Sequence, residues 1–230
     1  CVEGGFKNSE EFVEAKALSI SSANVYYAHL VKEKYRSKDS KPYARTALCK
    51  AVLENNQVDT NILLNGGEDI MERGNSDGDT ALHYAAKQTG DVSTAELLRS
   101  LTNVPNAEGL TPLFFAIEYK HVEMAAFLIT ISDTSIRSKD GDSLLHFVAE
   151  HADNAELARS LNIPVDVQNR RGITPLMLAA SHNHHQIVKY LLADGADPTV
   201  KDLRGRIALD FAQVYPKREE CIALLEAGAR

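Results

Sequence analysis

The chain has 230 residues, of which 44% are hydrophobic and 25% charged, and its formal net charge is −7. These fractions are typical of a globular protein, and no apolar run approaches the roughly 18 residues that a membrane-spanning helix requires. The negative charge argues against a nucleic-acid partner, because phosphate binding requires a positively charged face.

The first 42 residues predict two helices, at about 9–18 and 22–35. One face of the second helix collects residues at helical spacing: Ala23, Tyr27, Leu30 and Lys34. Together the two helices have the length of one repeat of the kind described below. We interpret residues 1–42 as an N-terminal helical cap or degenerate repeat, and a separate helical motif remains the alternative.

The cysteines are few and widely spaced, at Cys1, Cys49 and Cys221. This pattern predicts neither a disulfide framework nor a zinc site. It fits a reducing cytoplasm, and equally an exported protein that needs no disulfide. A processed bacterial lipoprotein also begins with cysteine, so Cys1 leaves a periplasmic location open.

From residue 46 onward a short string recurs every 31 to 34 residues, and a period of this length indicates a repeat architecture. The strings begin with Thr46-Ala47-Leu48, Thr80-Ala81-Leu82, Thr111-Pro112-Leu113, Ser143-Leu144-Leu145, Thr174-Pro175-Leu176 and Ile207-Ala208-Leu209. The Thr or Ser predicts a helix cap, and proline at the first helical position lacks only an N–H that would be unpaired anyway.

A tight turn is predicted ahead of five of these strings. Two residues before each stands a glycine (Gly78, Gly109, Gly141, Gly172 and Gly205), and three residues earlier a small polar residue (Asn75, Asn106, Ser138, Asn169 and Asp202). Glycine supplies the positive φ of such a turn, and the polar side chain bonds its own backbone. Each unit therefore reads as a hairpin, a first helix with small apolar residues, and a second helix with a longer apolar stripe, clearest at 187–192.

These strings resemble the ankyrin-repeat family, whose units open on a Thr-Pro-Leu-His-like motif. The resemblance covers residues 43–230 as about six repeats. It implies an all-α ankyrin-repeat solenoid, with a helix-turn-helix and a β-hairpin loop in each repeat. Some positions depart from the pattern: Ala44 replaces a glycine, the repeats ending near 101–104 and 161–164 are shortened, and Ile207 occupies a cap position before an insertion near Tyr215-Pro216.

Catalytic and metal-binding motifs are not apparent in the sequence. The family resemblance implies that His83 and His146 bond backbone between repeats. His182, His184 and His185 lie close in sequence, but no cysteine or nearby carboxylate completes a zinc site. The glycines stand alone in hairpins, and no Gly-x-Ser-x-Gly elbow occurs. We therefore expect no enzyme activity, no cofactor and no metal.

In this family, partners commonly meet the hairpin tips and first helices on one concave face. The resemblance therefore implies a partner-binding set here: Asp77, Asp79, Tyr84, Glu108, Leu110, Phe115, Tyr119, Asp140, Asp142, Arg170, Arg171, Arg204 and Arg206. The first tips are mainly acidic, although Lys139 interrupts them, and the last two are basic. The alternative is that these tips are simply solvated. Among the aromatic residues, Tyr119 is the expected anchor.

The sequence thus predicts a non-enzymatic scaffold, monomeric before binding, that docks one protein partner to mask, inhibit or localise it. Two alternatives stay open. One is an exported bacterial immunity-type protein that inhibits a periplasmic cell-wall enzyme, and the other is a bacterial or parasite effector that binds a host protein.

Overall fold

The computed structural model describes residues 20–36, 46–88, 91–214 and 218–228. Within these ranges the regular structure is entirely helical. The helices are α2 (Ile20–Tyr35), α3 (Ala47–Leu53), α4 (Gln57–Asn65), α5 (Ala81–Gln88), α6 (Val92–Leu97), the 3-10 helix η1 (Arg99–Leu101), α7 (Pro112–Glu118), α8 (Val122–Ile131), α9 (Leu144–His151), α10 (Ala155–Ser160), α11 (Pro175–His182), α12 (His185–Ala193), α13 (Ala208–Gln213) and α14 (Glu219–Gly228).

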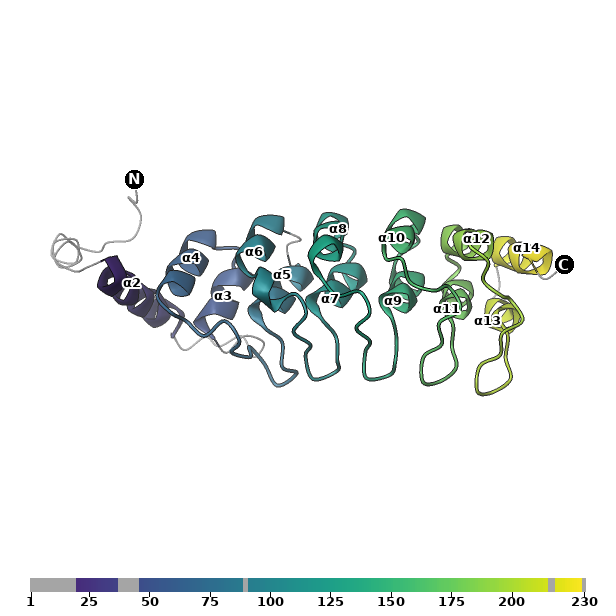
Figure 1. Cartoon of the computed structure of the whole chain (residues 1–230), viewed down its shortest axis with the longest axis horizontal. Helices are drawn as coiled ribbons and strands as arrows, with labels where there is room; N and C mark the ends of the chain where they lie inside the picture. The colour runs from purple at the N-terminus through teal and green to yellow at the C-terminus, as the bar shows by residue number, and fades with distance from the viewer. Residues whose placement is uncertain (1–19, 37–45, 89–90, 215–217, 229–230) are drawn as a thin grey trace.

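From α3 onward the described helices form six consecutive pairs stacked along one long axis (Figure 1). The first helices of the pairs make one layer and the second helices another, and the hairpin loops project together from one side. The predicted solenoid is confirmed, although its hairpins are closed by turns rather than by strands in the described residues. The boundary predicted at residues 42 and 43 lies outside these residues and stays a prediction.

The predicted cap residues stand at the starts of the first helices, although Thr111 makes no side-chain capping hydrogen bond. The Thr46 hydroxyl accepts the Cys49 N–H at 3.0 Å, and the Thr174 hydroxyl accepts that of Met177. Ile207 has no hydroxyl, and the Asp210 carboxylate accepts the Ile207 N–H at 2.8 Å instead. All five predicted turn glycines have positive φ, between 73° and 81°.

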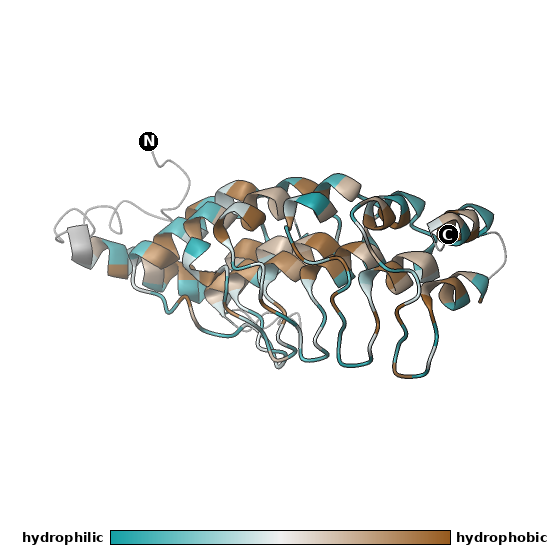
Figure 2. Cartoon of the chain, turned by 45° about the vertical axis from the view of Figure 1, so that its right-hand side comes forward, coloured by the Kyte–Doolittle hydropathy of each residue, from teal (hydrophilic) through white to brown (hydrophobic). Residues whose placement is uncertain are grey.

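The core runs without interruption between the two layers (Figure 2). It contains the leucine of each repeated string except the last, and these five are buried: Leu48, Leu82, Leu113, Leu145 and Leu176. A solenoid of this kind buries its apolar residues only by stacking neighbouring repeats, so each repeat depends on the next. In the part of the chain that the structure describes, no helix is both long and apolar enough to cross a membrane.

Helix α2 confirms the second helix predicted in residues 1–42, and the first lies outside the described residues. Its buried residues are Ala28, Val31 and Tyr35, so the inward face is displaced by one position from the predicted one. On this face α2 closely approaches the end of α4, where a Cβ on Gly66 would lie only 2.1 Å from that of Ala28.

The shortened repeats are confirmed in the second helices. Helices α6 and α10 have six residues each, whereas α8 and α14 have ten. In the first case the 3-10 helix η1 continues the chain, and in the second a turn follows directly. The outer layer of the solenoid is therefore uneven.

Candidate partner-binding face

The hairpin tips form one continuous row because backbone hydrogen bonds join each tip to the next. The N–H of Ala107 donates to the Asp77 carbonyl at 2.7 Å, and that of Lys139 to Glu108 at 2.8 Å. The same bond recurs from Arg170 to Asp140 at 2.9 Å and from Leu203 to Arg171 at 3.1 Å. These four bonds hold the tip backbones in fixed positions before any partner arrives.

Side-chain hydrogen bonds between equivalent positions of neighbouring repeats also join the hairpins at their bases. The Asn106 amide donates to the Asp79 carboxylate at 2.9 Å, and the Asn169 amide donates to Asp142 at 2.6 Å. Asp79 is fully buried and also accepts bonds from Asn75 at 2.9 Å and from Lys87 at 2.5 Å. Burial by itself would raise the pKa of Asp79, but these hydrogen bonds outweigh it and lower the pKa below its usual value.

The two repeat histidines have the structural role that the resemblance implied. His83 Nε2 lies 2.9 Å from the Leu110 carbonyl, and His146 Nε2 lies 2.9 Å from the Ile173 carbonyl. Burial lowers the pKa of His83 to about 4 and lowers that of His146 as well. Both rings are therefore neutral at pH 7, with Nε2–H donating to the next repeat.

The predicted partner-binding residues divide by exposure. Most lie on the surface of the tips or of a first helix: Asp77, Glu108, Tyr119, Asp140, Arg170, Arg171 and Arg204. Leu110, Asp142 and Arg206 are half-buried. Asp142 takes the bond from Asn169, and Arg206 pairs with Asp202 at 2.8 Å while stacking over the Phe211 ring.

Three of the predicted residues lie inside the protein and must be corrected. Asp79 is 0% exposed, Tyr84 4% and Phe115 7%. Asp79 belongs to the hairpin base described above. Tyr84 and Phe115 occupy equivalent positions of first helices and turn into the core, where the Lys87 ammonium covers the Phe115 ring at 4.1 Å from its centroid. A partner reaches none of the three directly, and they leave the proposed surface.

One surface residue escaped the prediction. Leu203 is 78% exposed at the tip of the last hairpin. The corresponding positions of the other tips carry Ser76, Ala107, Lys139 and Arg170. A large apolar side chain at this position is therefore an exception that the sequence alone could have identified. Leu203 and the half-exposed Tyr119 are the large apolar groups that this face offers to a partner.

The histidine group near the α11–α12 turn is held by local contacts. His184 Nδ1 lies 2.9 Å from the Ala149 carbonyl, and His182 Nδ1 lies 3.1 Å from that of Leu178. His185 Nδ1 is 3.8 Å from the Asp153 carboxylate. Across the described ranges, no three His, Cys, Asp or Glu side chains gather in a group suited to a metal ion.

The two described cysteines, Cys49 and Cys221, are buried and unpaired. Burial raises the pKa of Cys49 to about 12 and raises that of Cys221 above its usual value. Neither thiol ionises near neutral pH, and a thiol is a poor nucleophile until it ionises.

Comparison with known proteins agrees with this geometry. The family model for ankyrin repeats (3 copies) matches residues 18–104, 48–140 and 145–230. The NF-kappa-B p105 subunit of Mus musculus is 31% identical over 144 residues, 58% of this chain and 15% of that protein. NF-kappa-B inhibitor delta of Mus musculus is 34% identical over 101 residues, 40% of this chain and 30% of that protein. The chain thus spans less than a third of the length of these relatives.

A solved structure has the same fold along nearly its full length. It is a chain from the complex of a predatory endopeptidase from Bdellovibrio bacteriovorus with an immunity protein, with a TM-score of 0.68 and 24% identity. The alignment covers 83% of this chain and 99% of that one. Ankyrin-repeat folds typically serve as non-catalytic scaffolds for protein binding. On its repeats, its stacked helix pairs and these matches, the chain belongs to the ankyrin-repeat family.

Proposed function

We propose that the chain is a non-enzymatic scaffold, monomeric when free, that docks one protein partner on its hairpin-tip face. We define this face by Asp77, Glu108, Tyr119, Asp140, Arg170, Arg171, Leu203 and Arg204. The observation that carries the proposal is the row of four backbone hydrogen bonds between neighbouring tips. A surface that is ordered before binding loses little entropy on binding, so more of the contact energy appears as affinity.

The charges along this face favour one direction of docking. Asp77, Glu108 and Asp140 lie on the first three tips, and Arg170, Arg171 and Arg204 on the last two. A partner whose contacting surface is basic at one end and acidic at the other satisfies both halves, whereas the reversed direction places like charges together. Leu203 adds an apolar contact at the basic end.

For the consequence of docking, we propose that the partner is masked or inhibited. Two similarities support this proposal: one protein is named an NF-kappa-B inhibitor, and one solved chain comes from the complex of an endopeptidase with an immunity protein. The proposal has two narrower forms. In one the partner is an enzyme of the cell envelope, and in the other the chain is an effector and the partner is a host protein. They differ in the partner that is captured, not in the face that captures it.

The experiment compares charge reversal on and off this face. The tip variant carries Asp77→Lys, Glu108→Lys and Asp140→Lys, and the control carries Glu96→Lys, Glu219→Lys and Glu226→Lys. The control residues are exposed on second helices, and both variants change the net charge equally. We expect a protein captured from the native source by the wild type to be retained by the control and lost by the tip variant. Retention by both variants would show that the partner binds elsewhere.

Direct mapping completes the test. Hydrogen exchange on the purified complex should protect the tip amides of residues 106–109 and 138–141 more than those of α10 or α12. Adding the scaffold to the captured partner, if that partner is an enzyme, then shows whether its activity falls in proportion to complex formed. Unchanged activity at full occupancy would favour a localising role over inhibition.

A further inference from the structure

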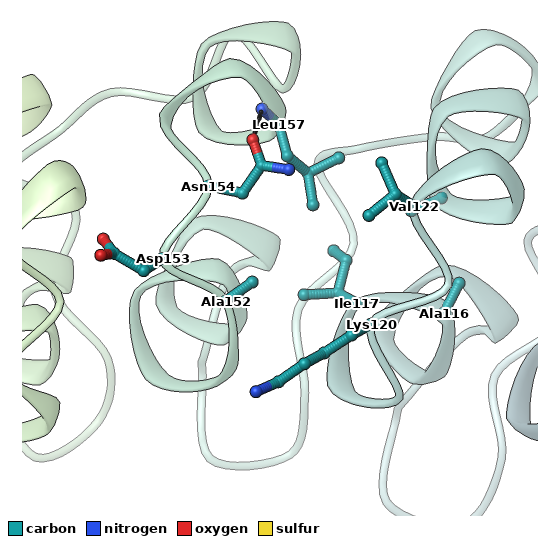
Figure 3. Close-up of a pocket in the computed structure, with 9 residues that line it drawn as sticks. Ala116, Ile117, Lys120, Val122, Ala152, Asp153, Asn154 and Leu157 are labelled. Carbon is teal, nitrogen blue, oxygen red and sulfur yellow. Dashed lines mark hydrogen bonds between the residues drawn. The ribbon is translucent and has the colours of Figure 1, made fainter.

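A pocket of about 180 Å³ opens between the third and fourth helix pairs (Figure 3). It lies between the α7–α8 turn and the α9–α10 loop, and its floor is apolar, formed by Ile117, Ala125 and Leu157. Each hairpin precedes a first helix and each turn follows it. The pocket is therefore separated from the hairpin side by the length of α7, roughly 10 Å for seven residues.

The two second helices beside the pocket differ in length. Helix α10 has six residues against ten in α8, and three loop residues separate it from α9. At the edge of the pocket Val122 remains 48% exposed. An engineered apolar cavity of about 150 Å³ holds one benzene molecule. This pocket has room for one aliphatic or aromatic side chain.

Three polar side chains line the pocket, and two of them, Lys120 and Asn154, can donate hydrogen bonds to an occupant. Asp153 reaches its rim, but the carboxylate points away and accepts the Ile187 N–H at 3.1 Å (Figure 3). Asn154 uses its Oδ1 to cap α10, accepting the Leu157 N–H at 3.0 Å, which leaves its amide N–H groups available. Lys120 extends from its turn toward the α9 side of the pocket.

Lys120 is the charged group that selects the occupant. Of the carboxylates in the described ranges, none lies within ion-pair distance of its ammonium. An occupant must therefore supply an acceptor, and the positive charge favours a carboxylate.

The backbone at Lys120 has the left-handed geometry that recurs between the two helices of other repeats, at Asn55 and Asn183. Its φ is 61°, in the left-handed region, where the other described non-glycine residues are all asparagines: Asn55, Asn162 and Asn183. Asparagine adopts this conformation more readily than lysine does. Strained residues of this kind concentrate at functional sites. Here the left-handed turn belongs to the repeat, and the strain that a lysine adds there is what Lys120→Gly relieves.

We propose that this inter-repeat pocket docks a segment of a partner protein that presents one large aliphatic side chain beside an Asp or Glu. The aliphatic group covers Ile117, Val122 and Leu157, and the carboxylate pairs with Lys120. The pocket lies at the opposite end of α7 from the charged hairpin tips, at the end where Tyr119 lies, so the inference does not depend on the tip charges.

The probes are three tetrapeptides, acetylated and amidated at their ends. Gly-Asp-Leu-Gly carries both features, Gly-Asn-Leu-Gly lacks the charge, and Gly-Asp-Ala-Gly lacks the large apolar group. In methyl NMR titrations we expect the first to shift the Val122, Leu157 and Ile117 signals with a Kd on the order of 1 mM. Each of the other two should bind at least about threefold more weakly.

Two glycine substitutions separate this role from stability. Lys120→Gly removes the ammonium and the strain together, so it should weaken the first peptide at least about threefold while raising the thermal midpoint. Asn183→Gly, with φ of 59° in the corresponding turn before α12, is the matched control and should leave binding unchanged.

Three results would overturn the proposal: no shift of the pocket methyls at 10-fold the expected Kd, equal binding of all three peptides, or unchanged binding by Lys120→Gly. The tip variant with reversed charges should bind the first peptide normally, so failure of the hairpin-tip proposal and failure of this one give different results.

Discussion

Replacing Asp79 by alanine tests whether this residue holds the first two hairpins together rather than meeting a partner. The change removes the acceptor of three side-chain bonds, from Lys87, Asn75 and Asn106, at 2.5, 2.9 and 2.9 Å. Removing one partner of a buried charge pair destabilises a protein by about 3–5 kcal/mol. Because the Lys87 side chain is a quarter exposed and its ammonium can turn to water, we expect the lower end, about 3 kcal/mol.

For a chain of this size, that loss lowers the thermal midpoint by about 6–12 °C. Urea unfolding followed by far-ultraviolet circular dichroism gives the free energy of unfolding. Asp77→Ala is the control, since this exposed neighbour should change stability by less than about 0.5 kcal/mol. Because repeats contact only their neighbours, amide exchange should accelerate first in α5 and α7.

The double variant Asp79→Asn with Lys87→Met sharpens the test. It removes both charges and keeps an acceptor oxygen for one neighbouring amide, so it should recover much of the stability that Asp79→Ala loses. The reasoning would be refuted if Asp79→Ala cost less than about 1 kcal/mol, no more than an exposed surface residue costs. Asp79 would then be free to face a partner, as the sequence first suggested.

Three further predictions concern the stack itself. The pKa of His83 is about 4 in the folded chain and about 6.5 in the unfolded chain, so the unfolded chain binds the proton first as the pH falls. The free energy of unfolding should therefore fall by on the order of 3 kcal/mol between pH 6.5 and pH 4. In urea titrations at a series of pH values, His83→Leu should flatten this dependence. Gly66→Ala should overpack the contact with Ala28 and cost about 1–3 kcal/mol, seen as faster amide exchange in α2 with α9 to α12 unchanged; unchanged exchange in α2 would contradict the close approach. Gly172→Ala and Gly205→Ala share a positive φ, but only the first places a Cβ 2.9 Å from the Leu203 N, so calorimetry should find Gly172→Ala the more destabilising of the two.

The sequence was sufficient for the periodic features of the fold. Turn glycines, helix caps and the leucine of each string follow from local chemistry, and all lie where the spacing placed them. The shortened second helices were also readable, because the residues that continue a helix are missing. What the sequence does not contain is the pocket between the third and fourth helix pairs, since a cavity depends on how two elements separated by a repeat pack together.

The partner-binding set was less accurate, and the misplaced residues show why. Asp79 was assigned to a tip by its charge, and the equivalent positions of the other repeats carry Leu110, Asp142, Ile173 and Arg206, which form no consistent inward pattern. Tyr84 and Phe115, by contrast, share a register with the buried Leu178. Comparing equivalent positions across repeats would have corrected Tyr84 and Phe115, but not Asp79. The cross-repeat bond from Asn106 to Asp79 could not be found this way, because it forms only once the repeats are stacked.

The row of tips is joined through main-chain atoms, and this affects how such a protein changes over time. Each joining bond runs from a backbone N–H to a backbone carbonyl, so it persists whichever side chains the tips carry. Substitutions at Asp77, Glu108, Asp140 or Arg171 can therefore accumulate without loosening the framework that presents them. The side chains determine which partner binds, whereas main-chain hydrogen bonds maintain the structure of the tips. The partner specificity of the chain can therefore change by substitution while the fold stays the same.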